Sequence, residues 1–431
     1  MIALLAAIAG FANLTPDAAQ TVALSNSPDV AAARARVEQS AAQLAATRDV
    51  IAPSLLSSYA QVPQGNPPGP AITSRLVTVG LQTTIADFLG YSASVRQAVL
   101  ALAGARADAD VAVRSERIKT VGLYYDALRN RGVAEARARA LQLAERARDA
   151  ARTRFAAGDA PRLDVLRADV AVSKAIADFE AARVNDENAT EALRVETGVP
   201  DATDLQAMRD DATSAPGTVA FDSADTTALA AAPVSANAAA APLVSAPYPS
   251  VAAVRDAALV TRAEIVSADA AVNAAAAARA VARTSGLPAI VASGGYTSGT
   301  DSGVQIGGPS INVSLTLPIG GANTARVRAQ NAQLAEARAR ASGARRTVLL
   351  EVTSAARSVA ALERAAAASS RARAGADAEL AAAELGYRSG ASSSFELAGA
   401  RDVDTQARVD EVSARYDLAK ARATLRLEIG R

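Results

Sequence analysis

The residues of this chain that could do chemistry are acids and serines close to two glycines. Asp164 follows Gly158, and Glu396 follows Gly390, by six residues in each case. The dipole of a helix favours an acid near its first turn, so both acids can be explained without a catalytic role. The three serines at 392–394 indicate a turn rather than a nucleophile.

The composition removes most enzyme chemistry. The chain has no histidine, the commonest general base and metal ligand, and no cysteine, so thiol nucleophiles and thiolate metal sites are excluded. The glycines of 294–308 indicate a loop, because no helix or lysine follows at phosphate-loop spacing. An enzyme built on Asp, Glu, Ser, Tyr and Lys alone stays possible, but no constellation supports it. We expect no enzyme, and no catalytic, cofactor-binding or metal-binding residues.

Charge and composition indicate long helices. The 45 basic and 44 acidic residues are interleaved, so there is no basic patch and nucleic acid is not an expected partner. Half of the residues are hydrophobic, but most of these are alanine, and aromatic residues make up 3%. A sequence rich in alanine and charge with few aromatic residues is typical of long helices that pack through narrow seams.

The chain contains one structural unit twice. Residues 155–198 align without a gap with residues 387–430, at a constant offset of 232. Gly158 pairs with Gly390 in this alignment, and Asp164 pairs with Glu396. A gapless register of this length indicates a tandem repeat, which has to be recognised before any local pattern is interpreted.

Each half of the chain predicts a helix, two strands, a long helix, a turn and a last helix. Helical spacing of apolar residues, alternation in the strands, and Pro or Gly at the boundaries carry this interpretation. In the first half we expect helices over 16–49, 92–156 and 162–197 and strands over 54–62 and 75–82, with a proline-rich loop over 63–70. In the second half we expect helices over 250–283 and 322–387, a turn at Gly390 and a last helix that ends at Gly430. The expected strands are 289–297 and 311–317, with a Gly/Ser/Asp loop over 297–309.

Two further segments lie outside the repeats. Residues 201–247 are rich in Ala, Ser, Thr and Pro without a usable period, which predicts a low-complexity linker. Residues 2–9 are apolar and end in Ala7-Ile8-Ala9, so 1–12 read as an export signal that lacks a basic start. The alternatives are a miscalled start codon and a buried apolar N-terminus. We divide the rest into repeats at 13–200 and 248–431.

The element lengths predict an antiparallel arrangement. The helix over 92–156 would be roughly 98 Å long, and the helices over 16–49 and 162–197 together roughly 105 Å. Two shorter helices laid end to end therefore match one long helix. About four strands per chain cannot close a membrane barrel, because the smallest have eight and open edges are not tolerated in lipid. Several chains must share one barrel if the strands span a membrane; otherwise they are soluble hairpins capping a helical bundle.

The pattern resembles the TolC-like outer membrane efflux proteins. The motifs that carry the resemblance are the two turns, Phe155-Ala-Ala-Gly158 with Leu163-Asp164 and Tyr387-Arg-Ser-Gly390 with Phe395-Glu396. The repeat ends Leu193-Arg-Val-Glu-Thr-Gly198 and Leu425-Arg-Leu-Glu-Ile-Gly430 also fit, as does Leu315-Thr-Leu-Pro318 before the second long helix. Each motif is weak alone, and their order and duplication make the match specific. It covers about 15–200 and 248–431.

The resemblance implies a mainly α fold with a small β part. Long antiparallel helices of three chains would form a trimeric α-barrel, and four strands per chain would contribute to a shared twelve-stranded β-barrel in the outer membrane. Such a protein is a passive exit duct of a tripartite efflux or type I secretion system. It would pass small molecules or exported proteins outward, with a large part in the periplasm. The implied partners are further copies of the chain, outer membrane lipid, a periplasmic adaptor and an inner-membrane pump or exporter.

The resemblance also assigns roles to the two turns. They would form periplasmic tips that dock to the adaptor through the residues Phe155, Gly158, Leu163, Tyr387, Gly390 and Phe395. The pore would narrow at acids, for which the implied residues are Asp164, Glu396 and Asp402. The place three residues after Glu396 is Gly399 where the family carries a second acid, and Asp402 and Asp404 lie nearby. A soluble periplasmic coiled-coil adaptor or scaffold stays open as the alternative, although an adaptor usually has one helical hairpin rather than two.

Overall fold

A computed structural model gives the structure of the chain over residues 15–49, 54–64, 72–84, 88–198, 251–284, 289–301, 304–316 and 321–429. The predicted export signal at 1–12, the linker at 201–247 and most of the loop at 63–70 lie outside the described residues.

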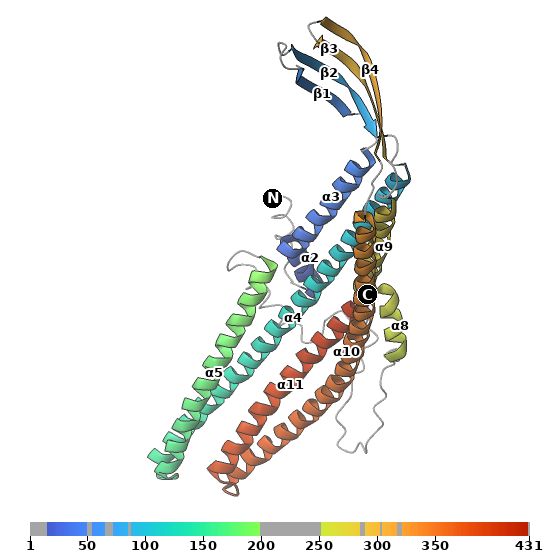
Figure 1. Cartoon of the computed structure of the whole chain (residues 1–431). Helices are drawn as coiled ribbons and strands as arrows, with labels where there is room; N and C mark the ends of the chain where they lie inside the picture. The colour runs from blue at the N-terminus through green and yellow to red at the C-terminus, as the bar shows by residue number, and fades with distance from the viewer. Residues whose placement is uncertain are drawn as a thin grey trace. The chain divides into compact units, whose positions relative to one another are not determined.

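The two halves of the chain repeat the same elements (Figure 1). The first half contains α2 (Pro16–Asn26), α3 (Pro28–Asp49), β1 (Ser54–Gln64), β2 (Ile72–Thr84), α4 (Phe88–Ala156) and α5 (Arg162–Thr197). The second half contains α8 (Val251–Thr261), α9 (Ala263–Thr284), β3 (Ala289–Asp301), β4 (Val304–Thr316), α10 (Ala322–Ser389) and α11 (Ser394–Ile429). The long helices α4 and α10 have 69 and 68 residues, and α5 and α11 have 36 each. The predicted mainly α fold is confirmed.

The first helix of each repeat is broken, which the sequence analysis did not predict. We expected one helix over 16–49, but Ser27 adopts an extended conformation with ψ of 122° and separates α2 from α3. The cause is Pro28, which disfavours helical geometry in the residue before it and cannot donate a hydrogen bond. The expected helix over 250–283 is broken at Arg262 as well, although no proline stands there.

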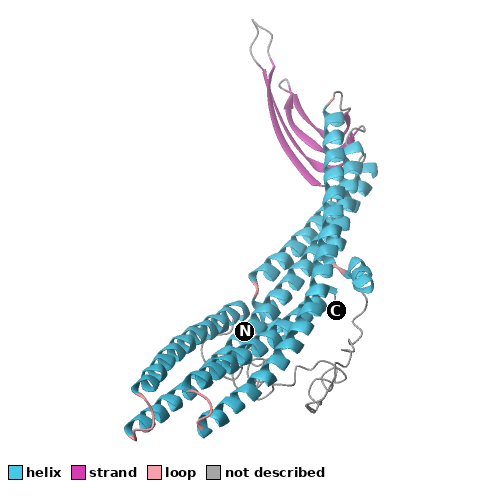
Figure 2. Ribbon diagram, turned by 90° about the horizontal axis from the view of Figure 1, so that it is seen from below, coloured by secondary structure: helices cyan, strands magenta, loops and turns pink. Residues whose placement is uncertain are grey.

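The four strands form one antiparallel sheet in the order β1-β2-β3-β4, which Figure 2 shows as a curved layer. The strands are longer than predicted, and the expected Gly/Ser/Asp loop over 297–309 is wrong. Most of that segment lies in β3 and β4, which pair from Ala289 with Thr316 to Asp301 with Val304. Glycines that indicated a loop instead permit close strand pairing: Gly80 faces Gly295 across β2 and β3, and a Cβ on Gly80 would lie 2.5 Å from the Gly294 carbonyl oxygen.

The two faces of the sheet differ in polarity. Val77, Val79 and Leu81 of β2 are 46–55% exposed on one face, and Tyr296 of β3 lies opposite Val79 on that same face. The other face carries glycines and a hydrogen bond of 3.0 Å between the hydroxyl groups of Thr78 and Thr297. A sheet with one apolar and one polar face is what a strand at a lipid–water boundary requires.

The described residues divide into two compact units. One contains the sheet with α9, most of α3 and the parts of α4 and α10 nearest to the strands in sequence (residues 32–111 and 263–347). The other contains α2, α5, α8, α11 and the remaining parts of α4 and α10. The core of the second unit is a set of helical seams, with Val121, Tyr125, Leu193 and Val352 at most 2% exposed.

One described helix, α9, is long and apolar enough to cross a membrane by length and composition. Its apolarity comes mainly from alanine, and its polar residues bind neighbouring helices. Ser267 hydrogen-bonds Asp108 of α4, and Asp269 accepts from Arg345 of α10 at 2.9 Å. These contacts indicate that α9 belongs to the helical seams.

Candidate functional site

The first tip joins α4 to α5 through a glycine in the left-handed region. Gly158 has φ of +83°, and the Asp159 amide donates to the Arg154 carbonyl over 2.8 Å. No other atom lies within 4 Å of a Cβ built on Gly158, so the backbone conformation and not packing requires glycine here. Phe155 and Leu163 flank the turn and are 46% and 52% exposed.

The second tip joins α10 to α11 in the same way. Gly390 has φ of +78°, and the Ala391 amide donates to the Gly386 carbonyl over 2.8 Å. A capping box then starts α11: the Glu396 amide donates to the Ser393 hydroxyl, and the Ser393 amide donates to Glu396 Oε2 over 2.9 Å. Phe395 stands next to this cap and is 70% exposed.

The structure brings residues of the two tips together through three contacts. The Ser394 hydroxyl of α11 donates to Asp164 Oδ1 of α5 over 2.7 Å. The Arg154 guanidinium of α4 lies 4.8 Å from the centre of the Tyr387 ring, and the Arg167 guanidinium of α5 lies 5.9 Å from the centre of the Phe395 ring. Cation–π contacts of this kind contribute about 0.5–1 kcal/mol each at exposed sites. The tips are therefore joined by polar and ring contacts that water can reach.

The three acids implied for the pore lie in different environments. Asp164 is largely covered, with a side chain 15% exposed that accepts from Ser394. Glu396 is exposed and closes the capping box of α11. Asp402 is 71% exposed and accepts from Lys174 of α5 over 2.9 Å, which raises the pKa of Lys174.

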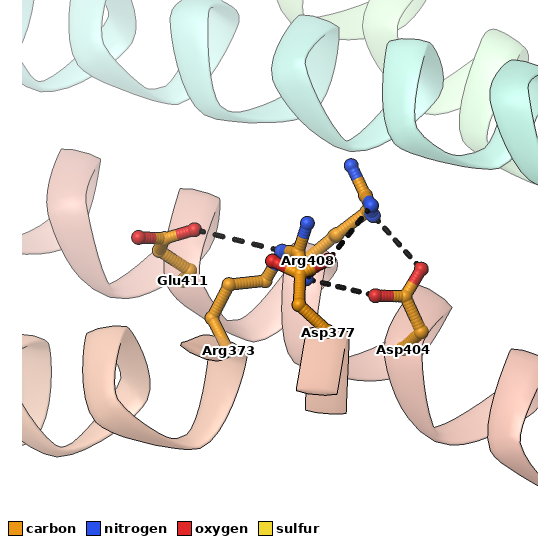
Figure 3. A network of polar contacts seen from close by, with 5 residues as sticks. All are labelled: Arg373, Asp377, Asp404, Arg408 and Glu411. Atoms are coloured by element: carbon orange, nitrogen blue, oxygen red, sulfur yellow. Dashed lines mark hydrogen bonds and ion pairs between the residues drawn. The ribbon is translucent and has the colours of Figure 1, made fainter. Parts of the chain in front are cut away.

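Asp404, the other acid near the missing family position, is not exposed. It is 1% exposed between α10 and α11 and accepts from Arg373 over 2.8 Å and from Arg408 over 2.9 Å. Both arginines also bind Asp377, and Glu411 lies 4.0 Å from Arg373 (Figure 3). Asp404 therefore joins two helices of one hairpin and does not present a free carboxylate.

This arginine–carboxylate cluster (Arg373, Asp377, Asp404, Arg408, Glu411) belongs to the second repeat alone. At the offset of 232, Asp404 and Arg408 correspond to Val172 and Ile176 of the first repeat. Apolar residues thus stand where the second hairpin carries ions. The cluster was not predicted from the sequence because its members lie on two helices and the contacts between these helices join residues far apart in the chain. The local signal was the spacing of four residues between Arg373 and Asp377 and between Asp404 and Arg408.

A second set of contacts fixes the helix breaks to the ends of α5 and α11. Asn26 Nδ2 donates to the Thr197 carbonyl over 2.7 Å, and the Ser27 hydroxyl donates to Glu116 Oε2 over 2.9 Å. In the second repeat, Thr261 Oγ1 donates to the Ile429 carbonyl over 2.8 Å. These contacts place the end of α5 at the break between α2 and α3, and the end of α11 at the break between α8 and α9.

The two helix breaks place their positive charge differently. Arg262, at the second break, is 1% exposed and binds Glu351 Oε2 over 2.5 Å. Glu351 corresponds to Glu116 and Arg262 corresponds to Ser27, both at an offset of 235. The first break thus has a hydroxyl where the second has a guanidinium, and it draws its positive charge from Lys119, which binds Glu196 of α5 over 2.5 Å.

This arrangement shifts two pKa values at the first break. Burial is the main cause that raises the pKa of the Glu116 carboxyl, followed by the hydrogen bond with Glu196. The hydrogen bond from Ser27 and the charge of Lys119 lower this pKa, and the charge of Glu196 raises it. The hydrogen bond to Glu196 raises the pKa of Lys119, to which the charge of Asp29 of α3 also contributes. Glu116 thus holds a proton more readily than an exposed glutamate.

Among the residues that the structure describes, no group of three or more acids could hold a metal ion. The polar side chains named above bind one another across helices, an arrangement that positions helices. The geometry therefore describes two duplicated helical hairpins with paired tips and an open sheet, the fold class of multi-chain channels made of a helical barrel and a strand barrel.

Comparison with known proteins agrees with this class. Residues 21–199 and 254–431 match the family model described as outer membrane efflux protein. Similar solved structures include a membrane protein from Pseudomonas aeruginosa, at 20% identity and a TM-score of 0.77 over 96% of this chain and 93% of that one. The CmeC outer membrane channel of Campylobacter jejuni has 18% identity and a TM-score of 0.76, over 96% and 85%. The MtrE outer membrane channel of Neisseria gonorrhoeae has 21% identity and a TM-score of 0.74, over 96% of this chain and 88% of that one. No functionally curated protein matches the sequence.

The chain belongs to the outer membrane efflux protein family, because the family model matches both repeats over most of the sequence. It is accordingly an outer membrane efflux channel with a periplasmic helical extension, in a family that is not enzymatic and that works in tripartite efflux systems. The resemblance and the absence of enzyme function predicted from the sequence are confirmed. The family implies a trimer.

Proposed function

We propose that three copies of this chain form a passive exit duct. The observation that carries this proposal is the open edge of the sheet: β1 and β4 each pair with one strand of the described chain and lie at opposite edges. Unpaired strand edges are not stable in lipid, so strands of other copies have to cover them. Three sheets of four strands would close one barrel whose glycine- and threonine-rich face lines a wet interior.

A crosslinking experiment tests the closure between copies. The chain has no cysteine, so pairs can be introduced without background. We would combine Ser58→Cys in β1 with Ile306→Cys, Gly308→Cys or Ser314→Cys in β4, one at a time. Those β4 positions lie on the same face of the sheet as Ser58. At least one pair should give a covalent trimer on a non-reducing gel, and Ser58→Cys with Val313→Cys, which lie on opposite faces, should give none.

Conductance in a planar bilayer completes this test. A trimeric duct should conduct ions once it is inserted, whereas a soluble scaffold should stay in buffer as a monomer. Absence of both crosslinked trimer and conductance would refute the duct.

We also propose the division into repeats at 13–200 and 248–431, joined by a linker at 201–247, with an export signal at 1–12.

We propose that the tips dock to a periplasmic adaptor, which connects the duct to an inner-membrane pump or exporter. The support is the exposure of large apolar side chains at both turns: Phe155, Leu163 and Phe395 are 46%, 52% and 70% exposed. Gly158, Gly390 and Tyr387 shape the turns. Small molecules or exported proteins would enter between the tips, where Asp164, Glu396 and Asp402 would line the narrowest part.

A pull-down with a periplasmic adaptor protein tests whether the tips form the docking site. Phe155→Ser with Phe395→Ser should weaken adaptor binding about tenfold or more, because exposed aromatic residues are common anchors of interfaces. Val260→Ser, at a side chain 79% exposed in α8, is the matched control. Unchanged binding of the tip variant would contradict this placement, and loss of the trimer in that variant would show a structural role instead.

A further inference from the structure

The ends of the helices next to the sheet carry arginines and almost no acids. The last turns of α3 and α9 and the first turns of α4 and α10 comprise the described residues 45–49, 276–284, 88–99 and 322–331. These segments contain six arginines, namely Arg48, Arg96, Arg279, Arg283, Arg326 and Arg328, which we name the arginine belt. The only acid in them is Asp49. Because the whole chain has a net charge of +1, this local excess is balanced by acids elsewhere.

All six arginines belong to the unit that contains the sheet. Arg48 lies one residue before the end of α3, and Arg283 one residue before the end of α9. At 1.5 Å per residue, the other four lie within about 12 Å of a helix end along the helix axis. Arg48 and Arg283 are equivalent positions of the two repeats, at an offset of 235, so the feature occurs in both halves.

The arginine belt is accessible. Arg48, Arg96, Arg283, Arg326 and Arg328 are exposed, and Arg279 is partly covered. The Arg279 Nε atom is buried without a hydrogen-bond partner among the described residues. Further along the helices, some exposed arginines bind acids, for example Arg345 with Asp269, and others bind backbone carbonyls of their own helix, for example Arg364 with Ala360. Six arginines against one acid in these segments favour an anionic partner from outside the chain.

The apolar face of the sheet begins immediately beside the arginine belt. Leu55, the second residue of β1, is 76% exposed and faces Leu81 of β2, which is 55% exposed. The same row continues across Gly294 to Ile311 of β4, which is 85% exposed. Since exposed apolar rows of this kind face hydrocarbon in a membrane channel, the hydrocarbon boundary falls near the helix–strand junctions. The arginine belt then lies at the depth of lipid headgroups on the periplasmic side.

We propose that the arginine belt binds the phosphate groups of anionic phospholipids in the periplasmic leaflet of the outer membrane. Guanidinium groups form paired hydrogen bonds with phosphate oxygens, and clusters of four to eight basic residues at a membrane surface attract anionic lipids by about 1 kcal/mol per residue. Such a ring of bound lipid would fix the depth of the channel in the membrane. This inference rests on the sheet spanning the membrane.

The experiment compares lipid retention by a belt variant and a matched control. The variant carries Arg48→Gln, Arg279→Gln, Arg283→Gln and Arg328→Gln, and the control carries Arg338→Gln, Arg346→Gln, Arg364→Gln and Arg371→Gln on the exposed surface of α10. Trimers are placed in vesicles of phosphatidylcholine mixed with phosphatidylglycerol and extracted in mild detergent. Native mass spectrometry then counts each retained lipid.

Wild type and control should retain phosphatidylglycerol in preference to phosphatidylcholine, and this preference should fall about tenfold or more in the belt variant. Added salt should weaken it, because exposed charges are screened. Equal retention of the two lipids by wild type, or an equal loss in variant and control, overturns the proposal. If the belt variant does not insert into vesicles, the relative retention of phosphatidylglycerol and phosphatidylcholine by wild type still tests the proposal.

Bilayer conductance separates this proposal from its alternatives. If the arginines face the pore instead, the belt variant will lose anion preference in its reversal potential while its lipid retention stays unchanged, which overturns the lipid site. If wild type conducts but shows no lipid preference, only the lipid site fails. If wild type does not conduct at all, the proposed duct fails as well.

Discussion

Glu116 and Glu351 occupy the same position in the two repeats but bind different partners. Glu351 binds Arg262, whereas Glu116 binds the hydroxyl of Ser27 and lies beside the carboxyl of Glu196. At the first helix break, which lies at Ser27, the positively charged side chain is Lys119 instead. The corresponding residue of the second repeat is Ser354. The positively charged side chain is therefore buried at the second break and more than half exposed at the first.

This difference predicts a pH dependence at the first break. Burial raises the pKa of Glu116, so the folded chain binds its proton more tightly than the unfolded chain does. The free energy of unfolding should therefore fall as the pH rises through the raised pKa, and the contribution of the proton is fully present at lower pH. Glu116→Gln should remove this slope. Thermal unfolding of wild type and variant at about pH 5 and about pH 7.5 measures the difference.

Glu351→Gln is the matched control for that experiment. It should destabilise the protein by about 1–3 kcal/mol at both pH values, because buried Arg262 loses its carboxylate partner. An identical pH slope in wild type and Glu116→Gln would show that Glu116 does not titrate differently in the two states.

Asp402 and Asp404 permit a second comparison at the scale of single residues. Asp404→Ala should cost about 3 kcal/mol, because it leaves Arg373 and Arg408 without their buried carboxylate. Asp402→Ala should cost at most about 1 kcal/mol, since both members of its pair with Lys174 are more than half exposed. Denaturant unfolding of the trimer measures both. Equal costs would mean that the cluster is not buried in the assembled channel.

At the scale of elements, α4 and α11 approach closely at a glycine. A Cβ on Gly132 would lie 2.5 Å from Val412 Cγ1, and valine cannot easily turn away because its χ1 is restricted. Polar contacts hold the same two helices: Lys420 binds Asp126 over 2.7 Å, and Arg129 binds Asp417 over 3.2 Å. The glycine thus lets one helix of each repeat pack tightly against the other.

This packing predicts opposite effects of two Gly→Ala changes. Gly375→Ala should stabilise α10 by about 1 kcal/mol, because alanine is the better helix former and nothing lies within 4 Å of the added carbon. Gly132→Ala should instead destabilise the protein by about 1–3 kcal/mol, because overpacking against Val412 outweighs the better helix propensity of alanine. The thermal midpoint of each variant is the measurement, and a rise in both would show that α11 can shift without cost.

The sequence predicted several elements accurately and others only in part. Helix 162–197 was predicted with the bounds that the structure has, because Pro161 and Gly198 mark its ends and Gly198 adopts φ of +66°. The break before Pro28 carried a local signal that we did not use. The break at Arg262 carried no such signal, since contacts with Glu351 and Glu428 of distant helices hold it.

At the scale of the whole molecule, the tips should matter more for transport than the loops and the linker. Proline cannot adopt the positive φ of Gly158 or Gly390. Gly390→Pro should therefore reduce efflux strongly, whereas a changed sequence in 201–247 should leave it nearly unchanged. Drug accumulation in cells that express each variant measures this. Equal tolerance of both changes would count against the tips.

Deletion of residues 64–69 is the corresponding test of the predicted external loop. The trimer should still assemble, because the deletion removes only the last residue of β1 and leaves the pairs from Ser54 with Gln82 to Pro63 with Thr73. Resistance of the trimer to SDS before heating reports the result, and its loss would refute an external position for this segment.

The sequence by itself determined the duplicated order of elements, the glycine turns, the faces of the strands and the family, because these follow from local spacing and from a register repeated along the chain. The tertiary structure decided which charges are buried: Asp404 lies between two arginines, Glu116 lies beside Glu196, and Arg262 is inserted between helix ends. Burial depends on which distant helices meet, and an alanine-rich sequence with few large side chains contains little local information about that.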